Sequence, residues 1–421
     1  MTKSSTALES QSSPPTRHSI ARQAVPLTLA LAASLLISIS PLNPFTHSAF
    51  TSTTNSPNFS HLHYSKQCPG LEFISTEEFT DRRTNLGKLL RGEEGDQWGA
   101  YVSEPSPNTL YYTNLSQSSW YLSERPWTLA ITPSGPNSSH LSVLTPSFEV
   151  SRSQRLPFAL NKEDFEKVSW VAWKEEEDPY RILVEHLESL KEADGFGEGQ
   201  GWTIHLEENV RQFVSAGLQA AGQQIQNVKP KVELAALVVR EQRMRKTENE
   251  LALQRCAGKV TLEALRTVRR LLTLGMTEKD GEAFILDALT AAGLTDLDSI
   301  VLFGENAALP HASAGDERRL KEGDFALFDV GGALGGYFSD YTRTMLPDLP
   351  SRGSHGRMTK KQQWPSARAE KIWKTVHRAQ EAALKVLESE EVYAAEVDRA
   401  AREVIEEEGW GERFTHRVGH G

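Results

Sequence analysis

The sequence predicts an α/β protein with two folded domains, the second of which combines helices with a strand hairpin. The chain has 421 residues, enough for two domains, and its 38% hydrophobic and 24% charged residues are ordinary for a folded protein. Short strand-like runs alternate with helical patterns over residues 68–228. Amphipathic helical patterns surround a strand-like hairpin over residues 234–421. The net charge of −10 argues against nucleic acid as a partner.

Residues 1–65 hold an apolar run inside a segment rich in Ser, Thr, Pro and Asn. The run of residues 24–39, from Ala24 to Ile39, predicts a targeting sequence for the secretory pathway. It fits a membrane signal anchor, or a cleaved signal peptide that leaves a secreted protein, and a buried amphipathic helix is the alternative. We expect the remaining residues up to Ser65 to form a disordered linker.

The cysteines and the N-glycosylation sequons give information about the cellular compartment of the protein. Cys68 and Cys256 are the two cysteines of the chain, and they imply no disulfide framework. We interpret Cys256 as a small buried side chain on a helix, and we expect folding to begin near Cys68. Sequons at Asn58, Asn114 and Asn137 are compatible with luminal exposure, and they also arise by chance.

Alternation and spacing predict the elements of the first domain. Strand-like runs cover residues 98–102, 110–113, 127–132, 141–144 and 168–173. Helical patterns begin at Thr76 and cover residues 179–191 and 206–221. In the second domain, helical patterns cover residues 248–274, 278–292, 372–387 and 392–408, with Thr277 as an expected N-cap. Residues 348–364 are expected to form a surface loop.

Two carboxylates stand eleven residues apart on apolar, strand-like runs. Asp329 follows one run, glycines between 331 and 336 supply a turn, and Asp340 lies on the second run. A hairpin therefore brings Asp329 and Asp340 close together. Two such carboxylates repel each other unless a proton or a cation lies between them, so the pattern predicts a divalent metal site. Taken singly, an Asp in a Gly-rich turn is a turn former.

Three histidines are candidates to join these carboxylates. His416 and His420 lie four residues apart among glycines that discourage a helix, so we expect a strand with both rings on one face. The helical zinc motif H-E-x-x-H is disfavoured because its Glu is absent. His311 lies in a loop-like segment eighteen residues before Asp329. Imidazole ligands shift the metal preference toward manganese, iron, cobalt or zinc.

Asp329, Asp340, His420, His416 and His311 together resemble the site residues of the pita-bread metallopeptidases. The resemblance is to the branch of Xaa-Pro aminopeptidases and dipeptidases, and it rests on D-x-G, D-x-T-R-T and G-H-G motifs. It implies a creatinase-like amino-terminal α/β domain over residues 68–228 and a pita-bread catalytic domain over residues 234–421. Arg343 matches the family's arginine, and a structural strand residue is the alternative for it.

The resemblance implies a two-metal centre with Asp329, Asp340 and His420 as ligands. Manganese is the first expectation, and cobalt or zinc are the alternatives. His311 and His416 match histidines that hold the substrate and stabilise the tetrahedral intermediate. The implied reaction is hydrolysis, by a metal-bridged hydroxide, of the bond between an amino-terminal residue and proline. Peptides with proline in second position are the implied substrates, and a homodimer is the implied assembly.

One departure from the family pattern concerns two Glu ligands that follow the G-H-G motif. The chain ends at Gly421, so we expect a pita-bread domain that lacks its carboxy-terminal part, with weak metal binding and little turnover. A catalytically inactive scaffold or binding protein is therefore one alternative. A creatinase-like amidinohydrolase is another, and the retained Asp329, Asp340 and His420 argue against it, because the Asp ligands are typically replaced there.

Overall fold

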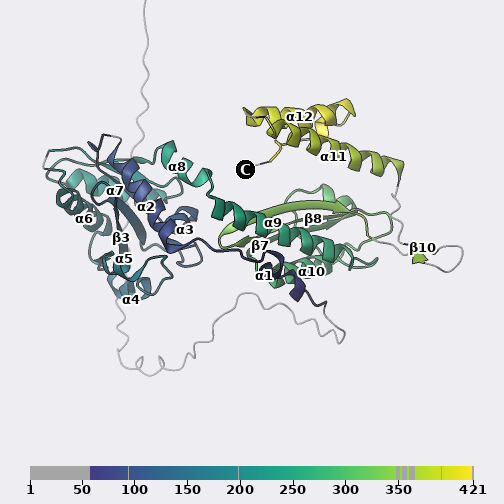
Figure 1. Ribbon diagram of the computed structural model, residues 1–421, viewed down its shortest axis with the longest axis horizontal. Coiled ribbons are helices and arrows are strands. Elements are labelled where there is room, and N and C mark those ends of the chain that lie inside the picture. The colour runs from purple at the N-terminus through teal and green to yellow at the C-terminus, as the bar shows by residue number, and fades with distance from the viewer. Residues whose placement is uncertain are drawn as a thin grey trace, which may run out of the picture. The chain divides into compact units, whose positions relative to one another are not determined.

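Figure 1 shows the computed structural model of the chain. The structure describes residues 57–92, 94–197, 199–347, 351–352, 358–359, 366–389 and 391–419. The chain divides into two units, residues 1–57 and 58–421, and the elements below belong to the second. The apolar run of residues 24–39 and His420 lie outside the described residues. No helix in the described part of the chain is both long and apolar enough to cross a membrane.

The described chain begins with a short segment that packs on the second half of the protein. It contains the 3₁₀ helix η1 (Ser60–Leu62) and α1 (Tyr64–Gln67). Phe59 and Leu62 are buried in the same apolar core as α9 (Glu248–Arg269) and α10 (Glu278–Ala291). The expected start of folding near Cys68 is therefore wrong, because two apolar side chains inside a polar stretch suffice to anchor it.

A six-stranded mixed sheet forms the first domain. Its strand order is β4-β3-β2-β1-β5-β6. The strands are β1 (Gly99–Ser103), β2 (Thr128–Pro133), β3 (Ser139–Pro146), β4 (Ser169–Trp173), β5 (Thr203–Leu206) and β6 (Lys231–Leu234). β1 pairs antiparallel with β2 and parallel with β5, so the sheet mixes both directions.

Helices cover both faces of this sheet. Alternate residues of a strand point to opposite sides, so β1 contributes side chains to an apolar core on each face. Ala100 and Val102 face a core shared with α6 (Pro179–Ala193) and α7 (Gln212–Gln224). Tyr101 faces a second core shared with α2 (Thr76–Arg91) and α3 (Pro107–Thr113). Shorter helices are η2 (Ser147–Glu149), α4 (Val150–Ser153), α5 (Lys162–Glu166) and α8 (Leu237–Met244).

Two predictions in this domain are wrong. Residues 110–113 belong to the helix α3 because Ser106 caps its start with a capping box and Pro107 occupies the first turn. These caps outweigh the strand preference of the following Tyr residues. The helix expected from residue 206 begins only at Gln212, because Leu206 ends β5 and pairs with Val102.

A three-stranded antiparallel sheet and two helices form the core of the second half. The strands are β7 (Thr295–Phe303), β8 (Ala326–Leu334) and β9 (Tyr337–Met345), in the order β7-β8-β9. The predicted hairpin is confirmed, with its turn at Gly335 and Gly336, which both have positive φ. Thr277 caps α10 as expected, since its side chain accepts a hydrogen bond from the Asp280 amide.

The last described elements are two helices that pack on each other. They are α11 (Ala367–Leu387) and α12 (Ala394–Glu407), followed by η4 (Gly411–Arg413). Ala379, Ala383, Ala401 and Ile405 form their shared core. Within residues 348–364, the short strands β10 (Ser351–Arg352) and β11 (Met358–Thr359) pair antiparallel, and the rest of the expected surface loop lies outside the described residues.

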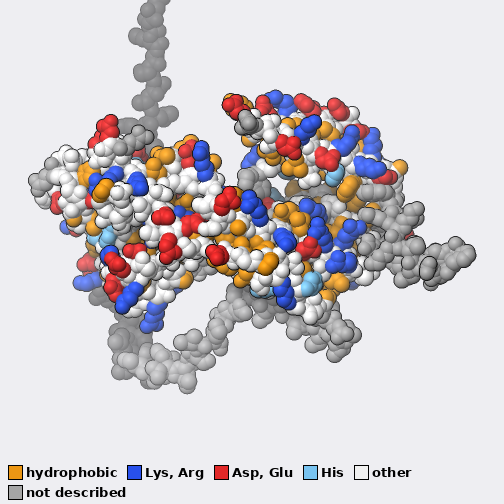
Figure 2. Space-filling model, in the orientation of Figure 1, with side chains coloured by type: hydrophobic (Ala, Val, Ile, Leu, Met, Phe, Trp, Pro, Cys, Tyr) orange, Lys and Arg blue, Asp and Glu red, His pale blue; other side chains and the backbone are white. Residues whose placement is uncertain are grey.

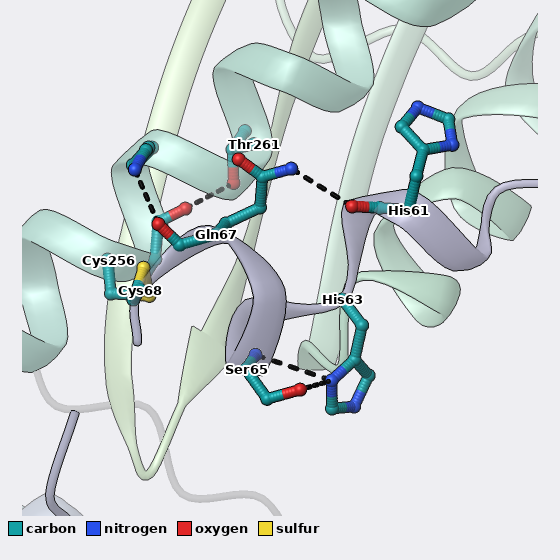
Figure 3. The surroundings of a disulfide bond; sticks show 9 residues. His61, His63, Ser65, Gln67, Cys68, Cys256 and Thr261 are labelled. Carbon is teal, nitrogen blue, oxygen red and sulfur yellow. Dashed lines mark hydrogen bonds between the residues drawn. A yellow bond between two sulfur atoms is a disulfide. The ribbon is translucent and has the colours of Figure 1, made fainter. Parts of the chain in front are cut away.

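A disulfide joins Cys68 to Cys256 on α9 across 188 residues (Figure 3). The interpretation of Cys256 as a simple buried side chain is incomplete: it is buried, and it is also bonded. Near the disulfide, the Lys259 ammonium donates a hydrogen bond to the carbonyl oxygen of Gln67. The segment before the first domain is therefore held to α9 by a covalent bond and by a hydrogen bond.

Candidate metal site on the β7–β9 sheet

The pairing of β8 with β9 places Asp329 and Asp340 on one face of the sheet. Asp329 stands opposite Thr342, and Gly331 stands opposite Asp340. Residues directly opposite share a face, as do residues two apart on one strand, so the two carboxylates are diagonal neighbours. Thr342 Oγ1 donates a hydrogen bond to Asp329 Oδ1 at 2.6 Å. This bond fixes one oxygen of Asp329.

Helix α9 covers the opposite face of the same strands. Thr261 on α9 and Ser339 on β9 are joined through their hydroxyl oxygens at 2.7 Å. A Cβ at Gly258 would lie 2.8 Å from the Tyr341 hydroxyl, so the glycine permits close packing of α9 on the sheet. Because side chains alternate along a strand, Asp340 and Thr342 point away from α9. Asp340 is exposed, and Asp329 is half-buried.

A row of three residues crosses the sheet beside this pair. Gly331 is the Cα partner of Asp298 on β7 and of Asp340 on β9. A Cβ at Gly331 would lie 2.0 Å from the Ser339 carbonyl oxygen, which requires glycine at this position. The middle of the row therefore carries no side chain between two carboxylates. Asp298 was not among the predicted site residues, because β7 begins with alternating polar residues that do not form an apolar run.

His311 lies in an exposed loop, as predicted, with a left-handed φ of 57°. The buried carboxylate of Glu278, at the start of α10, holds the segment on both sides of it. Oε1 accepts hydrogen bonds from the Phe303 amide at 2.8 Å and from Asn306 Nδ2 at 3.0 Å. Oε2 accepts one from the Gly315 amide at 3.1 Å. The backbone around His311 is thus tied to the first turn of α10.

His416 lies in an exposed segment without regular secondary structure, so the strand expected from residue 416 is wrong over the described residues. The backbone here bonds to side chains of α12 and not to a neighbouring strand. The Val418 amide donates to Asp398 Oδ1 at 2.8 Å, and Arg402 donates to the His416 carbonyl at 3.2 Å. His416 Nδ1 lies 2.9 Å from the carbonyl oxygen of Arg417.

The contacts of Arg343 agree with the alternative that it is a structural strand residue. Its guanidinium lies over the Tyr341 ring, 5.3 Å from the centroid, and Nη1 donates a hydrogen bond to the Thr342 carbonyl at 2.8 Å. The alternation of β9 places it on the face opposite to Asp340.

The donor set around Asp329 and Asp340 fits a divalent cation in part. Carboxylate oxygens are ligands for hard and borderline ions, and the two side chains share a face. In the part of the chain that the structure describes, no three His, Cys, Asp or Glu side chains come close enough to hold a metal. Of the three predicted site histidines, His311 and His416 are therefore not joined with both Asp residues into such a group, and His420 lies outside the described residues.

Comparisons with known proteins identify the family. A family model described as metallopeptidase family M24 matches residues 252–421. An uncharacterised peptidase of Schizosaccharomyces pombe is 36% identical over 356 residues, which are 83% of this chain and 70% of that protein. The chain belongs to metallopeptidase family M24.

Solved structures of the M24 fold agree with this assignment. Dipeptidase PepE from Mycobacterium ulcerans has a TM-score of 0.61 and 27% identity, over 83% of this chain and 82% of that chain. A prolidase from Thermococcus sibiricus has a TM-score of 0.60 and 24% identity, over 81% of both chains, and shows the fold alone. The resemblance to pita-bread metallopeptidases and the mixed α/β fold are therefore confirmed, and the M24 chain is a peptidase of a metal-dependent family.

Proposed function

We propose that this M24 chain is a metal-dependent exopeptidase that hydrolyses the bond between an amino-terminal residue and proline. The observation that supports it is the hairpin register, which gives Asp329 and Asp340 a common face on the side away from α9. The D-x-T-R-T motif on β9 and the G-H-G motif support the Xaa-Pro branch. Proline forms a tertiary amide without an N–H, so its recognition needs a dedicated site.

Asp329 and Asp340 are the residues that would hold the cation, with His420 as the proposed third ligand. The family resemblance favours two ions, with manganese first and cobalt or zinc as alternatives. A bound divalent cation would supply a Lewis acid that polarises the scissile carbonyl and lowers the pKa of water. Thr342 orients Asp329 through its hydrogen bond to Oδ1. The Gly331 position keeps the sheet surface beside Asp340 free of a side chain.

His311 and His416 are proposed to bind the peptide and to stabilise charge on its carbonyl oxygen. Imidazole N–H groups suit this role because they donate hydrogen bonds to a developing oxyanion. Glu278 supports it by fixing the backbone on both sides of His311. The exposed position of His311 leaves its ring accessible to a substrate. We further propose, on family resemblance, a homodimer, which light scattering of the purified protein tests.

An activity assay tests the proposal. The full-length gene product is stripped of metal with a chelator, and hydrolysis of an alanyl-proline dipeptide is followed before and after manganese is restored. We expect turnover only with metal, and loss of turnover in Asp329→Asn. Asp287→Asn, a change at an exposed residue on α10, is the matched control. Turnover that survives metal removal, or full turnover in Asp329→Asn, contradicts the proposal.

The same assay distinguishes the proposed exopeptidase from a catalytically inactive scaffold protein. Metal binding that Asp329→Asn abolishes, without hydrolysis of Xaa-Pro dipeptides or longer Xaa-Pro peptides, identifies a binding protein on the M24 fold. Hydrolysis of creatine instead of peptides identifies an amidinohydrolase.

A further inference from the structure

The disulfide indicates the compartment in which the protein folds. Both cysteines of the chain are joined, so neither Cys68 nor Cys256 remains a thiol. Disulfides persist in oxidising compartments and are rare where cellular thiols keep cysteines reduced. Formation of this bond removes two electrons and two protons from the two thiols, which a protein disulfide oxidant of that compartment accepts. N-linked glycans are added in the same compartment in eukaryotes.

The sequons at Asn58, Asn114 and Asn137 differ in the hydrogen bonds of the asparagine side chain and in the burial of the adjacent residues. Asn114 ends α3 in the left-handed conformation, between buried Thr113 and Leu115. Its Nδ2 donates to the Pro157 carbonyl at 3.5 Å. Asn58 Oδ1 accepts a hydrogen bond from the Ser60 amide at 2.9 Å. At Asn114 the nitrogen that would carry a glycan is itself bonded, and at Asn58 the oxygen of the same side-chain amide is bonded.

Asn137 lies at the tip of the hairpin between β2 and β3. Pro136, Asn137 and Ser138 are all exposed. The turn itself is anchored, because the Gly135 amide donates to Asp194 Oδ1 at 2.5 Å and Arg91 Nε donates to the Gly135 carbonyl at 3.1 Å. The turn closes with a bond from the Ser134 amide to the Ser138 carbonyl at 3.0 Å. A sugar on Asn137 would extend into solvent from a fixed support.

We propose that Asn137 is an N-linked glycosylation site. Its Nδ2 attacks the anomeric carbon of a lipid-linked oligosaccharide, so that an N–C bond forms and the sugar–oxygen bond to the pyrophosphate breaks. The amide nitrogen loses one proton, and the lipid pyrophosphate leaves. Ser139, the third residue of the sequon, begins β3 and is half-buried. The glycan covers a hairpin of the amino-terminal domain and leaves the β7–β9 sheet of the proposed metal site unchanged.

Expression in a eukaryotic secretory host, with residues 1–57 retained, tests this site. A glycosidase that removes N-linked glycans should increase the gel mobility of the wild-type protein, and mass spectrometry should find the released site at Asn137. Asn137→Gln and Ser139→Ala should each lose one glycan. Ser139→Thr is the matched control, because it keeps the sequon and should keep the glycan. Circular dichroism and a count of free thiols verify that each variant is folded and disulfide-bonded.

Three results overturn the inference. They are an unmodified Asn137 in the secreted protein, glycans confined to Asn58 and Asn114, and free thiols in a protein that carries no glycan. None of these results depends on peptidase activity, so a failure here is distinct from a failure of the proposed function.

Discussion

The Tyr337 hydroxyl donates a hydrogen bond to Glu250 Oε1 at 2.9 Å, and this pair joins β9 to the first turn of α9. Arg82 on α2 donates to the same hydroxyl at 3.1 Å, and its guanidinium lies 3.4 Å from Glu250 Oε1. Glu250 is fully buried, and Arg82 is nearly so. A buried charged network therefore connects the amino-terminal domain with the elements that carry Asp340.

Removing the Tyr337 hydroxyl should destabilise this connection. Burial raises the pKa of the Tyr337 hydroxyl, so it stays a neutral donor across the physiological range. Tyr337→Phe leaves Glu250 with one donor fewer, and we expect a loss of about 1–3 kcal/mol in the free energy of unfolding. Urea denaturation measures it. Tyr121→Phe, at a residue that is 84% exposed, is the control, and equal effects of the two changes contradict a role for the network.

Glu278→Gln should lower activity through the loop of His311. The side-chain NH2 of the new Gln cannot accept a hydrogen bond, so the amide of either Phe303 or Gly315 loses its acceptor. The segment that contains His311 is then held less firmly. We expect kcat/KM for an Xaa-Pro dipeptide to fall about 10- to 100-fold, mainly in kcat, since small displacements of a substrate-binding group are costly. Asp287→Asn is the control. A lower melting temperature with unchanged kcat/KM would show that Glu278 supports the fold alone.

Stability should fall in mild acid because of His186, a half-buried histidine on α6 in the first domain. Burial lowers the pKa of His186 to about 4, and the ring bonds the Ser142 hydroxyl at 2.9 Å. The unfolded chain, with a histidine pKa near 6.5, binds more protons than the folded chain between these values. Folding stability is therefore present above about pH 6.5 and declines as the pH falls toward about 4, by at most about 3 kcal/mol from this residue.

Denaturation at a series of pH values checks this expectation. His186→Gln should flatten the acid dependence between pH 6.5 and 4, and His377→Gln, at an exposed histidine on α11, should leave it as in the wild type. An unchanged slope in His186→Gln would contradict the assignment.

Loss of the disulfide should destabilise the protein. The bond closes a loop of 188 residues that contains the whole amino-terminal sheet. Cross-links of this kind restrict the unfolded chain, and their removal costs about 2–5 kcal/mol. A reductant should therefore lower the melting temperature of the wild type and leave that of the Cys68→Ser, Cys256→Ser double variant unchanged. The same reductant effect on both proteins would exclude the disulfide as its cause.

Local signals explain which parts of the fold were predictable. The Thr277 cap and the hairpin of β8 and β9 depend on residues that are neighbours in sequence, and both are confirmed. The short strands β5 and β6 were missed because four residues carry too little alternation.

In the candidate metal site, too, only the contacts between residues close in sequence were predictable. The sequence predicted that Asp329 and Asp340 meet on a hairpin, because their spacing and the glycines between them determine the register. It did not predict the role of Glu278, whose three partners lie 25 to 37 residues away. The Cys68–Cys256 bond was likewise missed, because a separation of 188 residues carries no local signal.

The central claim is that Asp329 and Asp340 jointly bind a divalent cation on the face of β8 and β9 that points away from α9. Calorimetric titration of the metal-free, full-length protein with manganese tests it most directly. We expect saturable binding in the wild type and in Asp287→Asn, and a loss of affinity of tenfold or more in Asp340→Asn, because removing one charged ligand from a site leaves too few donors. Equal manganese affinity in Asp340→Asn and the wild type would contradict the account.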